Sequence, residues 1–272
     1  MSDRPGLDPT QLDRYSRQVI MEELGPAGQA ALLDATVLCV GAGGLGSPAI
    51  QYLAAAGVGT LGIVDDDSVE RSNLQRQTVH GDGDVGRPKV DSAREFVEAL
   101  NPDVEVRTHE TRLTSDNAEG LVGEYDLVVD GSDNFPTRYL VNDACVLAGV
   151  PFVHGAVLRF EGQATTVAAG GEPCYRCLFP EAPPEGAVPD CATAGVLGAV
   201  PGTVGTVQAT EAVKLLVGHG DSLEGRLLVY DAAGPSFETV PYRPNPDCPA
   251  CGETPAIGSL ADVEYAGGCG VD

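Results

Sequence analysis

The chain of 272 residues contains almost no lysine: its sixteen basic residues are fourteen arginines and only Lys89 and Lys214. Tryptophan is absent, and only two methionines are present. No apolar run reaches the roughly 18 residues that a membrane-spanning helix requires. The first residues also lack the basic and apolar regions of a secretory signal peptide. We therefore expect a cytoplasmic protein that has no membrane partner.

Positive charge is scarce in relation to negative charge as well. Forty acidic residues against sixteen basic ones give a formal net charge of −24. Nucleic-acid binding requires a basic face, and none can be drawn from this sequence. Dense carboxylates on a surface are typical of proteins from salt-accumulating halophiles, in which they keep the protein solvated. The composition therefore predicts a halophilic protein that does not bind nucleic acid.

Strand and helix patterns alternate along the chain and predict an α/β fold. Polar helices are expected over 10–33 before the first strand, and the later strands turn to antiparallel pairing. We predict a Rossmann-like, mostly parallel sheet in a single domain, 1–252, followed by a tail, 253–272. The predicted strands are 36–40, 60–65, 104–109, 126–130, 151–157, 162–168, 226–231 and 237–242. The predicted helices are 10–24, a short helix to about 33, 47–56, 88–99, 115–122, 135–148 and 203–217.

A glycine-rich turn follows the first predicted strand. The stretch "VLCVGAGGLGSPAIQYLAAAGVG" places Gly41, Gly43 and Gly46 in the pattern G-x-G-x-x-G, between a strand and a helix. This turn lets backbone N–H groups and a helix N-terminus approach a phosphate. Asp65 ends the next strand, where a ribose hydroxyl would be bound. The pattern alone is compatible with NAD and with other nucleotides.

The scarce cations favour a triphosphate over NAD. Arg71, Arg76, Arg87 and Lys89 fall within 19 residues, directly after Asp65. A triphosphate carries about four negative charges and usually recruits Arg, Lys and a metal ion. Lys89 also begins a predicted helix, where a positive charge is unfavourable unless an anion is present. We therefore predict that this segment binds ATP.

Two carboxylates could supply the metal ion that accompanies a triphosphate. Asp130 and Asp133 end the fourth predicted strand, at the carboxyl edge where open α/β sheets bind ligands. Mg²⁺ keeps most of its waters and needs only one or two carboxylates. An Asp after a strand is also common in ordinary turns. Beside the glycine loop and the cations, the magnesium role is the better interpretation.

The eight cysteines divide into groups with different expected roles. Cys174, Cys177, Cys248 and Cys251 form two C-x-x-C pairs, the spacing of a closed structural Zn²⁺ site that would clip together the part from 170 to 252. A redox or disulfide role is the alternative for these four. Cys39 and Cys145 lie in predicted core segments, and Cys269 has no evident role. The four histidines, at positions 80, 109, 154 and 219, are scattered, and we interpret them as structural or surface residues.

Six motifs occur in an order that identifies a family. They are "RYSRQ" (14–18), "GAGGLGS" (41–47), "VDDDSVERSNLQRQ" (64–77), "VGRPK" (85–89), "DGSDN" (130–134) and "CYRC…CPAC". Together they resemble the MoeB/ThiF (HesA) family, relatives of the ubiquitin-activating enzymes, and the acidic composition is similar to that of a haloarchaeal member. The resemblance runs from about Leu12 to Gly252. Two departures are small: Ala42 replaces a residue that is often Leu, and the proline of "GVLGAVPG" comes later than usual.

The resemblance implies an adenylyltransferase that activates the C-terminal glycine of a ubiquitin-like modifier or sulfur-carrier protein ending in Gly-Gly. The product would serve protein conjugation, molybdopterin synthesis or tRNA thiolation. The family's nucleotide-binding positions correspond to Gly41, Gly43, Gly44, Gly46, Asp65, Asp67, Asn73, Arg76, Lys89 and Asp133. Among these, Arg76, Lys89 and Asp133 would also act in catalysis, and Asp133 would place Mg²⁺.

Two further residues acquire roles from the resemblance. Arg17 would reach the phosphates of the neighbouring subunit, which implies a homodimer. Cys191 would form a thioester or a persulfide, since the family places its covalent cysteine there, although some relatives do not need it. The absence of a Ser/His/Asp arrangement agrees with adenylation, because a terminal carboxylate is already an anionic nucleophile and needs no general base.

Two other functions remain open at this stage. An NAD-dependent oxidoreductase would explain the glycine turn but not the cation cluster or the cysteine pairs. A non-catalytic, zinc-stabilised scaffold for ubiquitin-like proteins would explain the cysteines but not the intact Arg17, Arg76, Lys89 and Asp133.

Overall fold

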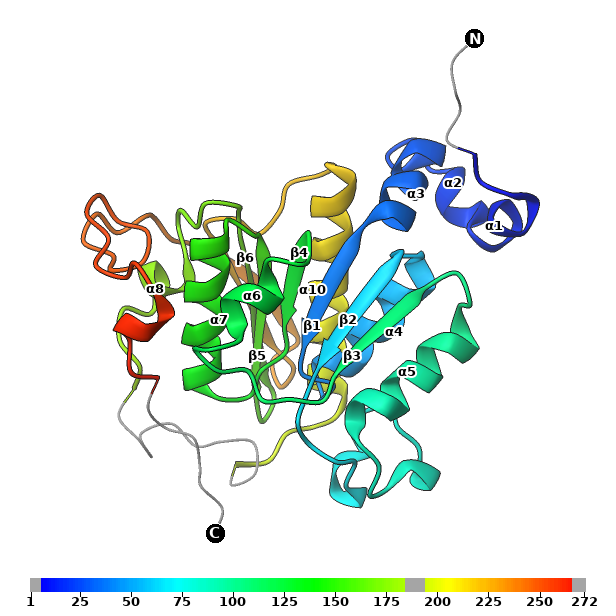
Figure 1. The fold of residues 1–272 in the computed structure, drawn as a ribbon, viewed down its shortest axis with the longest axis horizontal. Helices are drawn as coiled ribbons and strands as arrows, with labels where there is room; N and C mark the ends of the chain where they lie inside the picture. The colour runs from blue at the N-terminus through cyan, green and yellow to red at the C-terminus, as the bar shows by residue number, and fades with distance from the viewer. Residues whose placement is uncertain (1–5, 184–193, 266–272) are drawn as a thin grey trace.

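A single eight-stranded sheet organises the molecule in the computed structural model, which describes residues 6–183 and 194–265 (Figure 1). The strand order is β3-β2-β1-β4-β5-β6-β7-β8. The first five strands pair in parallel, and β6, β7 and β8 are antiparallel to their neighbours. The predicted Rossmann-like sheet with antiparallel C-terminal strands is therefore confirmed. The strands are β1 (Thr36–Val40), β2 (Thr60–Val64), β3 (Glu105–His109), β4 (Leu127–Asp130), β5 (Phe152–Leu158), β6 (Glu161–Val167), β7 (Arg226–Asp231) and β8 (Ser236–Pro241).

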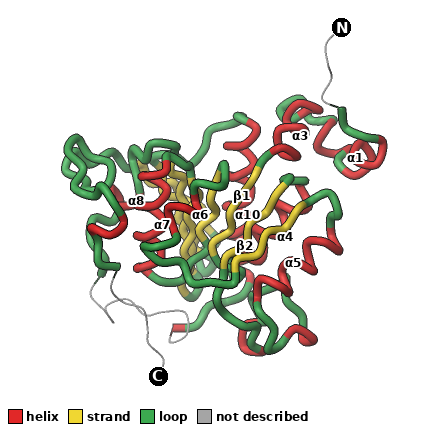
Figure 2. Tube along the Cα trace, viewed as in Figure 1, coloured by secondary structure: helices red, strands yellow, loops and turns green. Residues whose placement is uncertain are grey.

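Helices cover both faces of this sheet, as Figure 2 shows by colour. One face packs against α3, α4, α5 and α10, and the other packs against α6 and α7. The α-helices are α1 (Pro9–Arg14), α2 (Ser16–Val19), α3 (Gly25–Asp34), α4 (Gly46–Ala56), α5 (Lys89–Leu100), α6 (Ala118–Val122), α7 (Phe135–Ala148), α8 (Tyr175–Leu178) and α10 (Ala199–Val217). Three short 3₁₀ helices are η1 (Arg71–Asn73), η2 (Asp82–Asp84) and η3 (Leu260–Asp262).

The central strand β1 contributes to the hydrophobic core on both faces. Val37 and Cys39 belong to the cluster beneath α4 and α10, and Leu38 and Val40 belong to the cluster beneath α7. Successive strand residues point to opposite faces, so a strand buried on both faces is apolar at every position. This explains why "TVLCV" has no polar alternation. Burial raises the pKa of the Cys39 thiol to about 12, which fits the predicted core role.

Some helix boundaries differ from those predicted. The helix expected over 10–24 is two helices, because Tyr15 leaves helical geometry (φ −96°, ψ 12°) between α1 and α2. α10 begins at Ala199, four residues earlier than expected, because a proline in the first turn of a helix loses no intrahelical hydrogen bond. Among the described helices, none is long and apolar enough to span a bilayer.

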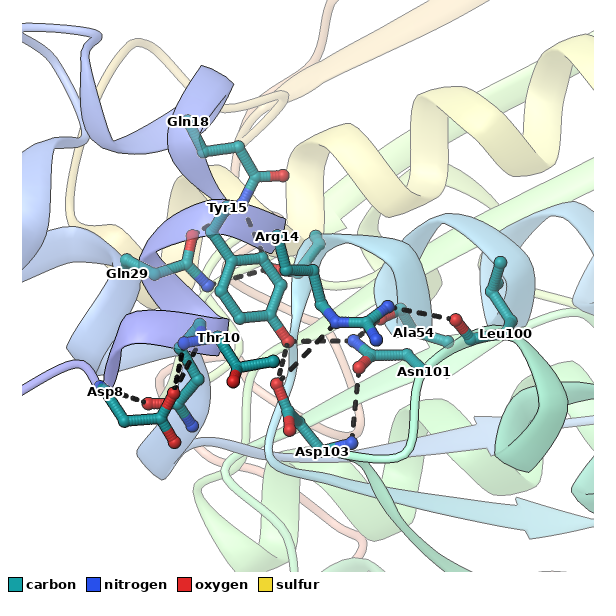
Figure 3. A network of polar contacts seen from close by, with 12 residues as sticks. Asp8, Thr10, Arg14, Tyr15, Gln18, Gln29, Ala54, Leu100, Asn101 and Asp103 are labelled. Carbon is teal, nitrogen blue, oxygen red and sulfur yellow. Dashed lines mark hydrogen bonds and ion pairs between the residues drawn. The ribbon is translucent and has the colours of Figure 1, made fainter.

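The N-terminal helices are fixed to the sheet domain by a polar network centred on Tyr15 (Figure 3). Tyr15 is 2% exposed, and its hydroxyl donates to Asp103 Oδ2 (3.1 Å) while accepting from Asn101 Nδ2 (2.8 Å). Arg14 Nη1 donates to the carbonyl of Leu100 (3.1 Å). Gln18 Nε2 donates to the carbonyl of Ala56 (3.0 Å). These bonds hold the arm that carries Arg17 in a defined position.

Part of the segment predicted as a tail packs against the domain. Leu260, in η3, is 1% exposed and belongs to the same hydrophobic cluster as α7. The hydroxyl of Tyr265 donates to Asp143 Oδ2 (2.7 Å), and the same carboxylate accepts from Arg176 Nη2 (2.6 Å). Residues 253–265 are therefore in contact with α7 and with the C-x-x-C turn that contains Arg176.

Candidate active site

The glycine turn after β1 requires glycine at specific positions. Gly41 has φ +89°, a conformation that L side chains rarely adopt. A Cβ at Gly46 would lie 1.9 Å from the carbonyl oxygen of Gly41, closer than any real contact. The turn therefore folds its backbone tightly against the first residue of α4. The result is a helix N-terminus that points into a small-residue turn, the arrangement that binds phosphates.

Asp65, at the end of β2, holds this turn in place. Its Oδ2 accepts from the backbone N–H of Ala42 (2.8 Å) and its Oδ1 from that of Asp67 (2.9 Å). Burial raises the pKa of this carboxyl, and the positive charge of Lys89 and the two backbone bonds oppose the rise. The predicted ribose contact of Asp65 stays a prediction.

Lys89 is a buried cation at the start of α5. It is only 5% exposed, and its Nζ lies 2.6 Å from Asp67 Oδ2 and 4.0 Å from Asp65 Oδ1. The carboxylate oxygens of Asp65, Asp66 and Asp67 lie within 4.8 Å of one another. A buried ammonium requires such pairing, because desolvation of an unpaired charge is costly. Lys89 is thus fixed between the end of β2 and the start of α5.

Arg76 lies across the glycine turn. A Cβ at Gly44 would lie 3.4 Å from both Cγ and Cδ of Arg76, so the stem of Arg76 packs over the turn. The guanidinium is positioned by Asn73, whose Oδ1 accepts from Nη2 (3.0 Å), and by the carbonyl of Ser72 (3.3 Å from Nη1). In residues 6–183 and 194–265, Arg76 has no ion pair with a carboxylate. Its positive charge therefore has no carboxylate to neutralise it beside the turn.

His80 connects the glycine turn to α5 by two hydrogen bonds. It is 7% exposed, its Nε2 lies 3.0 Å from the carbonyl oxygen of Ala42, and its Nδ1 lies 2.8 Å from the hydroxyl of Ser92 in α5. Burial lowers the pKa of His80, so the ring is neutral and donates one hydrogen bond while accepting the other. The structural role expected for this histidine agrees with these contacts, but a lone histidine gives no signal that it would contact the glycine turn.

The edge after β4 carries two aspartates in different environments. Asp130 is fully buried: its Oδ2 lies 2.7 Å from His154 Nδ1, and its Oδ1 accepts from the backbone N–H of Ser132 (3.0 Å). Asp133 is exposed, and its Oδ1 accepts from Asn134 Nδ2 (3.2 Å). A single exposed carboxylate fits a hydrated Mg²⁺, which needs few protein ligands. The magnesium role of Asp133 stays a prediction.

The two C-x-x-C pairs come together as predicted. The Sγ atoms of Cys174 and Cys248 lie 3.6 Å apart, and those of Cys177 and Cys251 lie 3.4 Å apart. All four Sγ atoms lie within 4.8 Å of one another. Tetrahedral Zn–S bonds of about 2.3 Å place two sulfurs roughly 3.8 Å apart, whereas a disulfide is about 2.05 Å long. The spacing therefore fits a Cys₄ zinc site and not a disulfide.

Three other residues singled out by the sequence are not part of the site described so far. Cys191 and Cys269 fall outside the described residues. Arg17 is exposed on α2, and in the part of the chain that the structure describes it forms no hydrogen bond or ion pair.

A cavity of about 620 Å³ is lined by Lys214, His219 and Arg226 among others, at the C-terminal end of α10. α10 has 19 residues and spans roughly 28 Å. Its N-terminal end contacts the glycine turn, so the cavity is remote from the candidate site.

Comparison with known proteins decides the family. The model of the ThiF family matches residues 15–250. The chain belongs to the ThiF family. It is 63% identical over 265 residues to the SAMP-activating enzyme E1 of Haloferax volcanii, and the match covers 97% of each chain. It is 53% identical over 259 residues to the sulfur carrier protein adenylyltransferase of Thermus thermophilus, covering 93% of this chain and 96% of that protein.

Solved structures of MccB from E. coli share the fold of this ThiF-family chain. The structure of MccB with ATP superposes with a TM-score of 0.77 at 20% identity, covering 93% of this chain and 76% of that one. The family predicted from the motifs is confirmed. Its assignment as an adenylyltransferase is confirmed too, because the close relatives are named adenylyltransferases and activating enzymes. The NAD-dependent oxidoreductase and the non-catalytic scaffold are therefore set aside.

Proposed function

We propose that this ThiF-family protein uses ATP to adenylate the C-terminal glycine of a ubiquitin-like modifier or sulfur-carrier protein that ends in Gly-Gly. The observation that carries the proposal is the pair of cations at the glycine turn. Lys89 is buried there, and Arg76 packs across Gly44 without a carboxylate partner among the described residues. In a chain of net charge −24, Arg76 over this turn and Lys89 nearby, the latter held by Asp65 and Asp67, point to a polyanionic ligand.

The reaction needs positioning and charge stabilisation more than acid–base chemistry. The substrate's terminal carboxylate oxygen attacks the α-phosphorus of ATP, a C–O–P bond forms, and the bond to the pyrophosphate oxygen breaks. Arg76 and Lys89 would stabilise the negative charge on the phosphates as pyrophosphate leaves. The backbone N–H groups of the glycine turn would hold the nucleotide in line with the attacking oxygen. No proton moves in this step.

Two metal ions belong to the proposal. Asp133 would hold a hydrated Mg²⁺, which neutralises phosphate charge when bound. Cys174, Cys177, Cys248 and Cys251 would hold a structural Zn²⁺ that ties the C-terminal residues to the turn before α8. The Zn²⁺ site has four protein ligands, so it would have no open position for chemistry.

The partners complete the proposal. Arg17 is exposed on an arm that Tyr15 fixes to the domain, and it would complete the phosphate site of a second subunit in a homodimer. Side chains on or beside this arm, Leu12 (44% exposed), Ile20 (71%) and Met21 (48%), offer apolar area for such a contact. The Cys191 thiolate would attack the carbonyl carbon of the acyl-adenylate and form a thioester as AMP leaves, or it would take a sulfane sulfur from a donor persulfide and release the donor's thiolate. Protein conjugation, molybdopterin synthesis and tRNA thiolation would then use the product.

The experiment that tests the proposal measures AMP and pyrophosphate from ATP with small ubiquitin-like proteins ending in Gly-Gly. We expect AMP only when such a protein is present, and at least a hundredfold loss of rate in Lys89→Met. Lys214→Met is the matched control, because Lys214 is the only other lysine and lies at the far end of α10. This variant should retain full activity. An equal rate of AMP formation in Lys89→Met and wild type would contradict the proposal. So would a rate that is the same with and without the Gly-Gly protein. If Cys191→Ala retained covalent transfer, Cys191 would have no role in the proposed mechanism.

A further inference from the structure

Arg138, in α7, is a buried cation without a counterion. It is 8% exposed, and within the described ranges no carboxylate lies within ion-pair distance of it. Its Cζ lies 4.9 Å from the centre of the Phe135 ring, and Nη2 reaches the carbonyl of Ser132 only at 3.5 Å. Its Nε has no hydrogen-bond partner. Burying an unpaired guanidinium is costly, so an anion that pairs with it is the simplest explanation for this arrangement.

The nearby buried carboxylate does not supply that anion. Asp130 is the register partner of His154 on the neighbouring strand, and both of its oxygens are occupied, by His154 Nδ1 and by the backbone N–H of Ser132. Burial lowers the pKa of His154, and the positive charge of Arg138 lowers it further. Burial raises the pKa of Tyr175, and the same charge opposes that rise. Arg138 therefore lies close to both rings and within hydrogen-bonding reach of the Tyr175 hydroxyl, but no carboxylate pairs with it in the described ranges.

Other polar atoms in this region also lack partners. His154 Nε2 is buried and has no hydrogen-bond partner within the described residues. Ser132 Oγ and the Tyr175 hydroxyl are also buried without a well-aligned hydrogen bond there, and they lie near Asp130 and Arg138, respectively. These three side chains are 1%, 7% and 1% exposed, respectively. Buried polar groups are nearly always hydrogen-bonded, so several unpartnered atoms around one cation indicate a place for a polar ligand. The Arg138 guanidinium and the two hydroxyls can donate to a carboxylate, whereas Nε2 of the neutral His154, whose Nδ1 donates to Asp130, can only accept.

This group lies beside the glycine turn, on the side opposite to Lys89. The loop of Gly131 and Ser132 touches the turn: a Cβ at Gly41 would lie 3.3 Å from the carbonyl oxygen of Gly131, and a Cβ at Gly131 would lie 3.1 Å from the N atom of Gly46. β4 and β2 flank β1 on opposite sides. Arg138 therefore lies on the β4 side of the nucleotide turn, and Lys89 lies on the β2 side.

We propose that Arg138 binds the terminal carboxylate of the polypeptide substrate and holds one of its oxygens toward the α-phosphorus. The inference rests on the proposed adenylation and adds a substrate-binding residue to it. A guanidinium can donate to one carboxylate oxygen while the other remains the nucleophile. Arg76 over the glycine turn and Lys89 on the β2 side then serve ATP, and Arg138 serves the acceptor. Each anion then has its own cation, which offsets their mutual repulsion while the reacting atoms are held close together.

The experiment compares Arg138→Gln with wild type in two measurements. The first is the Kd of a non-hydrolysable ATP analogue without any partner, which we expect to change less than twofold. The second is the KM of a Gly-Gly ubiquitin-like protein in AMP formation, which we expect to rise at least thirtyfold. Wild type should also bind this protein at least tenfold more tightly with a free C-terminal carboxylate than with a C-terminal amide. Arg138→Gln should lose that difference.

Arg138→Lys keeps the charge, so it should restore part of the preference for the carboxylate over the amide; it also provides the test should Arg138→Gln not fold. An unchanged KM in Arg138→Gln would overturn the inference while leaving adenylation intact. A loss of ATP affinity as large as the rise in KM would overturn it too, because Arg138 would then be a phosphate ligand. If wild type formed no AMP with any Gly-Gly protein, the proposed function and this inference would both be rejected.

Discussion

Gly46 illustrates how one residue constrains the nucleotide turn. It begins α4, and its Cα faces the carbonyl oxygen of Gly41, so no side chain fits between them. Gly43, three residues earlier, differs: a Cβ there would meet only Gln77 Nε2 at 3.6 Å, an ordinary contact. The two glycines of one motif therefore have different physical reasons for being glycine.

We predict that Gly46→Ala destabilises the fold by about 3 kcal/mol, because backbone on both sides must shift to accept the methyl group. Gly43→Ala should change the free energy of unfolding by less than about 1 kcal/mol, since its Cβ has room. Urea unfolding of the two variants measures the difference. Equal unfolding midpoints would show that the turn is less tightly packed than the Gly41–Gly46 contact requires.

At the scale of elements, α10 connects the nucleotide turn to the rest of the molecule. Its N-terminal half packs against α4 at Gly205, where a Cβ would lie 2.3 Å from the carbonyl oxygen of Leu45 and 2.5 Å from Pro48 Cγ. One turn earlier, Gly202 has no atom within 4 Å of the Cβ position. Close approach of two helices therefore depends on one of the two glycines only.

Substitution of these two helical glycines should have opposite effects. Gly205→Ala should destabilise the protein by about 1–3 kcal/mol, because α10 must move away from α4. Gly202→Ala should stabilise it by up to about 1 kcal/mol, because alanine is the better helix former and meets nothing. Thermal or urea unfolding of the pair gives the sign of each change. A destabilised Gly202→Ala would contradict the helix-propensity argument.

The cysteine cluster is the second element-scale feature, since it joins the turn before α8 to residues 248–251. We predict one zinc per chain in wild type and much less than one in Cys251→Ser. Loss of the ion should cost more than about 2 kcal/mol, which corresponds to at least ~5 °C in Tm for a domain of this size. Metal analysis by mass spectrometry and calorimetry provide the two readouts.

Cys145→Ala is the matched control for the zinc prediction. Cys145 is buried in α7 outside the cluster, and burial raises the pKa of its thiol, so it should not contribute a thiolate ligand. This variant should keep one zinc per chain. A wild-type protein without zinc would refute the assignment of the cluster.

At the scale of the whole molecule, buried histidines link stability to pH. Burial lowers the pKa of His80 and of His154 in the folded protein. Below the unfolded-state pKa of about 6.5, the unfolded chain then binds more protons than the folded one, so stability falls as pH falls. Each histidine contributes at most about 1.4 kcal/mol per pH unit.

We therefore predict that the free energy of unfolding is constant near pH 8 and declines from about pH 6.5 to pH 5.5. Denaturant titrations at one fixed salt concentration measure this slope. Burial lowers the pKa of His109 as well, so His80→Gln should reduce the slope by about a third. His219→Gln, which changes an exposed residue, is the control. A slope that is identical in wild type and His80→Gln would refute the assignment of His80 as a neutral buried group.

Much of the fold and part of the candidate site could be predicted from the sequence. Local sequence spacing is enough to predict the glycine turn, Lys89 at the start of a helix and the two C-x-x-C pairs. The pairing of Asp130 with His154 is different, because it depends on the register of β4 and β5, and no local pattern encodes it. The missing counterion of Arg138 is likewise a property of the packed molecule. The break at Tyr15 depends on its long-range contacts with Asn101 and Asp103.

The pairing of the only two lysines has a consequence for the proposed activation of Gly-Gly termini. Activated C-terminal glycines can form isopeptide bonds with ε-amino groups, so an activating enzyme is exposed to modification by its own product. Here Lys89 is buried against Asp67, and Lys214 donates to Glu211 and to the carbonyl of Asp221. Both amines are held in ion pairs, so Lys89 and Lys214 should be resistant to self-conjugation.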